Sequence, residues 1–236
     1  MNDKEIDQAL NQATPAGAVD RALLDRIAAN LRADLSPVRP LPSVWVLASA
    51  LILSSAAVAF GDAAYHGLFG IARMSIVRIG VIFTALAILS LLAARVSVGE
   101  MIPGSRRLVQ PGTLLAAGSL MLVVIFDALF NDPSMERFLP AGVACLVAGL
   151  VCALPVGLAS WLILRRGFAV NRVQAGLAVG TVAGLAGVIM LELHCPNFHT
   201  MHVVVWHTAV IPAAGLAGAA VAQAFRTKRS AAELMQ

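Results

Sequence analysis

Six apolar segments, each about twenty residues long, constrain the fold of this chain more than any other feature of its sequence. A helix needs roughly 20 apolar residues to cross the hydrocarbon core of a bilayer, and each segment ends at charges, Pro, Gly or Asn. Only 13% of the 236 residues are charged, against about a quarter in a typical soluble domain. We therefore expect an all-α, polytopic membrane protein with transmembrane helices over 44–61, 75–94, 113–131, 141–164, 173–193 and 203–225, between a head of residues 1–43 and a tail of residues 226–236.

The basic residues predict how these helices are oriented. Lys and Arg collect on the cytoplasmic side of membrane proteins, and successive connections alternate between the two sides. Fourteen Lys and Arg residues fall in the head, the second and fourth loops and the tail, whereas the opposite side holds only Arg73 and Arg137. Both termini are therefore expected in the cytoplasm, with the protein in a bacterial inner membrane. The positive charge then reflects topology, and we expect no direct contact with nucleic acid.

The head is too short to bury a core of its own, but it contains one amphipathic helix. Apolar residues recur every fourth position over 19–35, which is the spacing of one helix face. Pro37, Pro40 and Pro42 would form a stiff tether to the first membrane helix. Acids and bases balance on the polar face, whereas a helix that lies on a membrane is usually rich in Lys and Arg. Docking on a soluble partner is therefore favoured over lying on the membrane, through Leu23, Leu24, Ile27, Leu31 and Leu35.

Histidine and cysteine gather near the outer ends of the fifth and sixth segments. Four of the five histidines and one of the three cysteines fall within 194–207. Imidazole and thiolate suit copper and zinc, although the spacing matches no standard zinc signature, and an exposed Cys195 would also be open to oxidation. Cys145 and Cys152, in the fourth segment, are interpreted as small core residues. A metal or redox site and a purely structural loop both stay open; the candidate ligands are His194, Cys195, His199, His202 and His207, with Met201 as a thioether.

Three residues of charged type lie within the predicted membrane helices, near their outer ends: Arg78, Asp127 and Glu192. Such residues are costly in a membrane and mark candidate functional sites. One interpretation is that Arg78 pairs with Asp127 or Glu192 and fixes the helix packing. Another is a small membrane transporter or metal-handling protein that uses Asp127, Glu192 and His207 along a path. No phosphate-binding loop, nucleophile elbow or HExxH motif is present, so we expect no enzyme.

Glycines predict how two of the helices pack. Gly176, Gly180 and Gly184 are spaced by four on the fifth segment. They therefore share a face that lets another helix approach closely. Gly215 and Gly218 suggest a similar arrangement on the sixth segment.

Three short groups of residues stand out where the fifth segment ends and the sixth begins: Leu191 and Glu192, then His194, Cys195 and Pro196, and finally Trp206 and His207. Together with the topology, they resemble a known family, the NrsF-type (negative regulator of sigma F) anti-sigma factors. The resemblance implies a six-helix membrane protein whose head binds an extracytoplasmic-function sigma factor until a signal arrives. With the histidine cluster, it predicts release on a periplasmic metal or redox signal.

Overall fold

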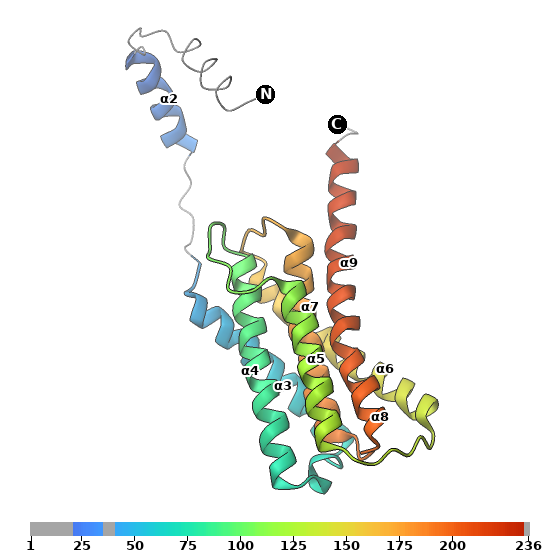
Figure 1. Cartoon of the computed structure of the whole chain (residues 1–236). Coiled ribbons are helices and arrows are strands. Elements are labelled where there is room, and N and C mark those ends of the chain that lie inside the picture. Colours follow the sequence, from blue (N-terminus) through green and yellow to red (C-terminus); the bar gives the residue numbers. More distant parts are fainter. Residues whose placement is uncertain (1–20, 35–40, 234–236) are drawn as a thin grey trace, which may run out of the picture. The chain divides into compact units, whose positions relative to one another are not determined.

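The computed structural model describes residues 21–34 and 41–233, which form helices joined by short loops (Figure 1). The chain divides into two units, residues 1–40 and 41–236, and each is described by itself. The first unit contributes helix α2 (Arg21–Asp34), which lies within the predicted span 19–35. On this helix the side chain of Ile27 is exposed. The last position of the predicted stripe, Leu35, and most of the proline-rich tether lie outside the described residues.

The second unit contains six helices that are long and apolar enough to cross a membrane, as the sequence predicted. The sixth begins as α8 (Thr200–His202), continues through the π-helical turn η2 (Val203–His207) and runs on as α9 (Thr208–Glu233). The other five are α3 (Val44–His66), α4 (Ile76–Glu100), α5 (Pro111–Leu129), α6 (Phe138–Leu164) and α7 (Arg172–His194).

Helices α3 and α4 extend beyond the apolar segments that predict them. Hydropathy marks where a helix leaves the hydrocarbon core, whereas the helix itself continues until its backbone is capped. The last turn of α3 carries an ion pair between His66 and Asp62, with Nδ1 and Oδ1 3.2 Å apart. Near the other end of the bundle, the Arg95 guanidinium lies 4.0 Å from the ring centroid of Trp45, so a cation–π contact joins α4 to the start of α3.

Polar residues at the helix starts account for several of the boundaries. The side chains of Ser43, Ser75 and Asn171 accept hydrogen bonds from backbone N–H groups in the first turns of α3, α4 and α7. These groups would otherwise lack a partner at a helix N-terminus. Pro111 begins α5, at a position where its missing N–H costs nothing.

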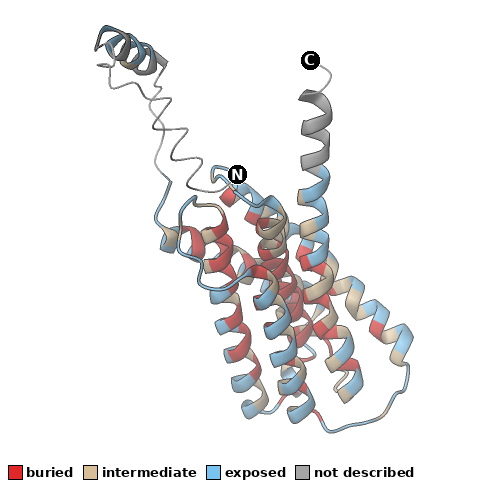
Figure 2. Cartoon of the chain, turned by 45° about the horizontal axis from the view of Figure 1, so that its top comes forward, coloured by how far each residue is buried: buried red, intermediate tan, exposed pale blue. Residues whose placement is uncertain are grey.

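Helix α7 forms the centre of the second unit. In its most apolar 18-residue window, 78% of the residues are buried, compared with 22–39% in the other five membrane-length helices. Figure 2 shows the buried residues in red, gathered in the interior of the bundle. A helix that is apolar on every side is suited to such a position, and the others present much of their apolar surface outward, as helices surrounded by lipid do.

The predicted glycine contact is confirmed between α7 and α9. A Cβ atom added to Gly176 would lie 2.4 Å from the carbonyl oxygen of Gly218, and one added to Gly180 would lie 2.3 Å from that of Ala214. A Cβ on Gly184 would lie 2.8 Å from the Cα of Ile211. The two backbones therefore touch over two turns of helix, so any side chain at these positions would force the helices apart.

Two ends of the bundle differ in their loops, and we name each by its characteristic residues. The histidine end comprises loops 67–75, 130–137 and 195–199; the arginine end comprises loops 101–110 and 165–171. At the histidine end the amide of Gly70 donates to the carbonyl oxygens of Leu193 and His194, at 3.0 and 3.1 Å. The first loop is thereby docked on the C-terminus of α7, where the candidate site lies.

Candidate metal centre

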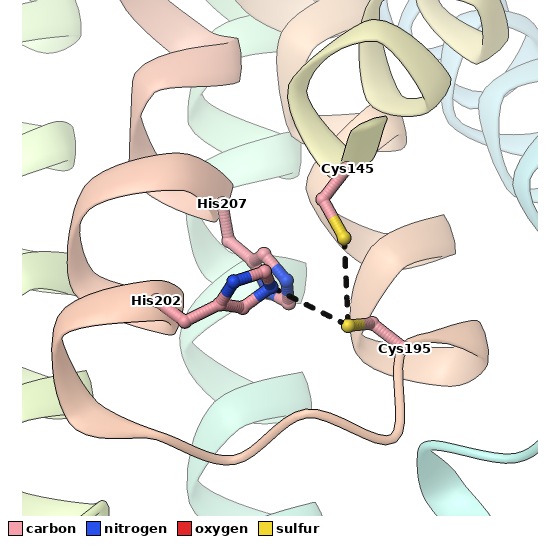
Figure 3. A group of neighbouring side chains, drawn as sticks. All are labelled: Cys145, Cys195, His202 and His207. Atoms are coloured by element: carbon pink, nitrogen blue, oxygen red, sulfur yellow. Dashed lines mark hydrogen bonds between the residues drawn. The ribbon is translucent and has the colours of Figure 1, made fainter. Parts of the chain in front are cut away.

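Four side chains with metal-binding atoms converge at the histidine end (Figure 3). Cys145 comes from α6, Cys195 follows α7, and His202 and His207 end α8 and η2. One ligand atom from each lies within 4.8 Å of all the others. The two sulfur atoms are 3.5 Å apart, and Sγ of Cys195 is 3.6 Å from Nε2 of His202. Cys145 is half-buried and the other three are buried.

The π-helical turn brings the two histidines to one side. In a regular α-helix of 3.6 residues per turn, side chains five residues apart point about 140° away from each other. In an i→i+5 turn, five residues make roughly one full turn instead. His207 therefore returns to the side that His202 occupies, and their ring centroids lie 5.3 Å apart.

A buried carboxylate fixes the orientation of one histidine. Oε1 of Glu192 lies 2.6 Å from Nδ1 of His207, and the two side chains are 1% and 2% exposed. With Nδ1 engaged, the ring has only Nε2 left for the cluster. This Nε2 atom is buried and has no hydrogen-bond partner among the described residues, and the same holds for Nδ1 of His202. Metal-binding histidines usually donate a hydrogen bond from the N–H of their second ring nitrogen to a carboxylate or carbonyl oxygen in this manner.

Two of the donor separations match those around a tetrahedral ion. Zinc bonds of about 2.3 Å to sulfur and about 2.0–2.1 Å to nitrogen require sulfur atoms about 3.8 Å apart and sulfur–nitrogen separations of about 3.6 Å. The separations in the structure are 3.5 Å between the sulfurs of Cys145 and Cys195, and 3.6 Å from Cys195 to His202. The four ligand atoms all lie within 4.8 Å of one another, and two thiols and two imidazoles suit zinc or copper, so these residues could hold either metal.

Cys195 is buried, with 5% of its surface exposed, so the expectation of an exposed thiol is wrong. The reason is the docked first loop, because a Cβ on Gly70 would lie 2.7 Å from the carbonyl oxygen of Cys195. The hydrogen bond with Cys145, together with burial, raises the pKa of the Cys195 thiol. A metal ion would have to displace the thiol proton, as is usual for cysteine ligands.

The other predicted ligands engage different partners. Nδ1 of His194 lies 2.9 Å from the carbonyl oxygen of Gly67, so this ring helps to hold the first loop. Met201 is partly exposed on α8. Of the five candidate ligands, the structure brings Cys195, His202 and His207 together and places His194 and His199 elsewhere.

His199 belongs to a polar clasp between the third and fifth loops. Its Nδ1 lies 3.0 Å from Oδ2 of Asp132 and also contacts the hydroxyl of Ser134. The amide of Thr200 donates to the carbonyl oxygen of Asp132 at 2.8 Å. The backbone N–H of Ser134, and to a lesser extent His199, hold the pKa of the Asp132 carboxyl below its ordinary value. The clasp therefore joins the loop before α6 to the loop that carries two of the donors.

Cys145 is the member of the cluster that the sequence interpretation assigned to the core. It lies fifty positions before Cys195, and nothing in its local sequence distinguishes it from Cys152, seven residues later on α6. Cys152 is 2% exposed and packs in the apolar core. The useful signal was depth, because Cys145 lies about one turn into the predicted apolar segment 141–164 from its outer end, close to the predicted depth of Glu192 and His207.

The remaining intramembrane polar residues do not join this site. Nε of Arg78 donates to the carbonyl oxygen of Leu129 at 3.1 Å, and its guanidinium lies 4.9 Å from the ring centroid of Phe130. Within residues 41–233, it forms an ion pair with neither Asp127 nor Glu192. Asp127 is exposed in the last turn of α5. Of the three residues of the hypothetical transport path, only Glu192 and His207 are in contact.

Six apolar helices packed around a buried α7 indicate a polytopic membrane protein, and the Cys and His cluster adds a candidate sensor to it. The family NrsF, negative regulator of sigma F, matches residues 31–226, which include all six candidate membrane spans. The chain belongs to this family of anti-sigma factors, whose members are regulators of a sigma factor, and the assignment agrees with the resemblance in its sequence. Searches of curated proteins and of solved structures find no match.

Proposed function

We propose that this protein holds an extracytoplasmic-function sigma factor at the bacterial inner membrane and releases it when a metal ion binds at the histidine end. The family match over residues 31–226 supports the anti-sigma role. The observation that carries the signal is the convergence of Cys145, Cys195, His202 and His207. Copper and zinc are the candidate ions, because thiolate and imidazole donors suit both.

The proposed orientation puts the histidine end in the periplasm and both termini in the cytoplasm. The arginine end carries the basic residues of the second and fourth loops, Arg106, Arg107, Arg165 and Arg166. Basic loops remain on the cytoplasmic side during insertion. The metal centre would then face the compartment from which an external signal arrives, and α2 would face the sigma factor.

We propose that α2 binds the sigma factor through its apolar stripe, as an amphipathic helix binds a groove. Ile27 is 46% exposed on α2, and Leu23 and Leu31 lie one turn before and one turn after it. Ile27→Asp should abolish co-purification of the sigma factor with the membrane protein and raise transcription of its target genes. Ala29→Asp is the matched control, because it adds the same charge two residues away, about 200° around the helix. Retained binding by Ile27→Asp would show that α2 does not make this contact.

The structure suggests how binding at one end changes the other. An ion would join α6, the end of α7 and η2, and α7 meets α9 backbone to backbone through Gly176, Gly180 and Gly184. Because their backbones are in contact, α7 and α9 would move together as rigid elements and would not slide past each other independently. An ion shifts such an equilibrium only by its different affinity for the two arrangements. We therefore expect tighter metal binding by the sigma-free protein than by the complex.

Two cysteines on one helix give a matched test of the metal centre. Cys145→Ser should lower the zinc or copper content of the purified protein and block the transcriptional response to the metal. Cys152→Ser should change neither, because Cys152 lies two turns away in the apolar core. Metal content by mass spectrometry and a reporter gene for the sigma factor measure the two effects. Equal metal content in both variants would exclude the proposed site.

Thiol oxidation is a second candidate signal, favoured by the 3.5 Å between the sulfurs of Cys145 and Cys195. A disulfide-bearing oxidant of the periplasm would accept two electrons and two protons from the two thiols as the S–S bond forms. His202→Ala separates the candidates, because it removes a metal ligand and leaves both thiols. A response that survives His202→Ala and is reversed by reductant would favour oxidation over metal binding.

A further inference from the structure

Glu192 is a buried carboxylate at the end of α7 that faces the metal centre without belonging to it. Its side chain is 1% exposed, and an isolated carboxylate is costly to bury. The partner that the structure gives it is His207, with Oε1 and Nδ1 2.6 Å apart. Glu192 therefore contacts one of the four donors through the ring nitrogen that the metal would not use.

We propose that Glu192 is the positioning residue of the metal centre, an inference that rests on the proposed metal signal. By accepting a hydrogen bond from Nδ1, its carboxylate holds the His207 ring in the tautomer and rotation that direct the Nε2 lone pair toward Cys195 and His202. Without an acceptor at this position the ring could turn over or protonate at Nε2. The fourth donor of the tetrahedral set would then be lost even though His207 itself remains.

The alternative role for Glu192 is a purely structural pair that fixes the packing of α7 against η2. A structural pair would need nothing further from the His207 ring. The structure instead leaves Nε2 of His207 buried and without a hydrogen-bond partner in the described part of the chain. Buried polar atoms in proteins are normally satisfied. An ion bound between Cys145, Cys195 and His202 supplies the partner that the protein does not.

The same end of the bundle offers a matched control. His66 and Asp62 also form a carboxylate–histidine pair, 3.2 Å apart on α3, and neither belongs to the donor cluster. Replacing Asp62 removes a carboxylate of the same kind at the same end of the protein. If replacing Glu192 weakens metal binding and replacing Asp62 does not, the effect is not a general consequence of losing a carboxylate near the histidine end.

The test is metal affinity of the full-length protein in detergent, measured by competition of Zn²⁺ and Cu⁺ with chromogenic chelators. Glu192→Leu removes the acceptor and should weaken binding about 10–100-fold, the usual effect of losing such a partner. Glu192→Gln keeps an acceptor for Nδ1–H and should recover most of the affinity. Asp62→Leu should bind as the unaltered protein does. The visible spectrum of bound Co²⁺ should indicate one nitrogen donor fewer in Glu192→Leu. The spectra of Glu192→Gln and Asp62→Leu should indicate the donor set of the unaltered protein.

Each result distinguishes this inference from the proposed function. If the unaltered protein binds neither Zn²⁺ nor Cu⁺, the metal signal and the role of Glu192 both fall. If it binds and Glu192→Leu binds equally well with an unchanged Co²⁺ spectrum, only the positioning role falls. If Glu192→Leu does not fold, Glu192→Gln decides: nuclear magnetic resonance of the metal-free form should show the proton of His207 on Nδ1, and a proton on Nε2 would overturn the inference.

Discussion

Replacing Gly180 by alanine tests the packing of α7 on α9, the contact that would connect the metal centre to the rest of the molecule. The added Cβ would lie 2.3 Å from the carbonyl oxygen of Ala214 and 2.8 Å from the Cα of Gly215. Both atoms belong to the backbone, so no side-chain rotation relieves the overlap. Ordinary van der Waals contact begins at 3.4 Å, and α7 and α9 must therefore separate locally by roughly 1 Å.

The expected cost follows from two opposing effects. Overpacking a well-packed interior typically costs about 1–3 kcal/mol, while alanine favours a helix over glycine by about 1 kcal/mol. Gly80 on α4 provides the matched control, because a Cβ there would meet nothing within 4 Å. The helix effect is common to both substitutions. Gly180→Ala should therefore be less stable than Gly80→Ala by about 1–3 kcal/mol.

The assay is reversible unfolding of the two variants in mixed detergent micelles, followed by helical circular dichroism. If α7 and α9 touch as described, Gly180→Ala should also alter repression of the sigma factor, whereas Gly80→Ala should leave it unchanged. Equal unfolding free energies for the two variants would refute the backbone contact between α7 and α9. Lower stability with unchanged repression would retain the contact and remove it from the signalling path.

Three further predictions concern the loops. Gly70→Ala would place a Cβ 2.6 and 2.7 Å from two backbone oxygens at the end of α7. The substitution should therefore displace the first loop from α7 and weaken Zn²⁺ binding. An unchanged dissociation constant for Zn²⁺ would show that the docked loop does not support the site. Nε of Arg107 lies 3.3 Å from Oε1 of the buried Glu100, so Arg107→Ala leaves this carboxylate without its partner and should destabilise the fold by about 1–3 kcal/mol. Adding Glu100→Gln should recover much of the lost stability, which thermal unfolding of the single and double variants would measure. Because the pKa of Asp132 is lowered in the folded protein, its contribution to the clasp is present above the ordinary carboxyl pKa and is lost as pH falls through the lowered value. Asp132→Asn should therefore reduce hydrogen-exchange protection of the Thr200 amide at pH 6, and the difference from the unaltered protein should shrink as pH falls through the lowered pKa. A difference that does not depend on pH would exclude this account.

Local sequence patterns predict much of this fold, because the signals that matter are local. An apolar run of helical length identifies a membrane helix without reference to the rest of the chain, and a four-residue glycine spacing identifies a close helix contact such as that at Gly180. The candidate site is different, because its parts come from three helices. Cys145 looks like Cys152 until α6 is placed against α7, and His194 and His199 look like ligands until their loops fold.

The π-helical turn also lies beyond sequence reasoning, since the run Val-Val-Val-Trp-His over 203–207 carries no mark of it. The burial of this segment does not mark the turn either, because Val203 and His207 are buried four residues apart, as on an ordinary α-helix, and Val205 is exposed. A propensity for helix is evident from the sequence, but one extra residue in a single turn is not.

That extra residue has a consequence for comparing sequences of this family. A π-helical turn is equivalent to an α-helix with one residue inserted, so His202 and His207, five residues apart, occupy the positions that two histidines four residues apart would occupy on an uninterrupted α-helix. Chains with either spacing can build the same pair of donors. A sequence pattern that fixes the interval between the two histidines would therefore divide relatives that share one centre, and the interval should be allowed to vary by one.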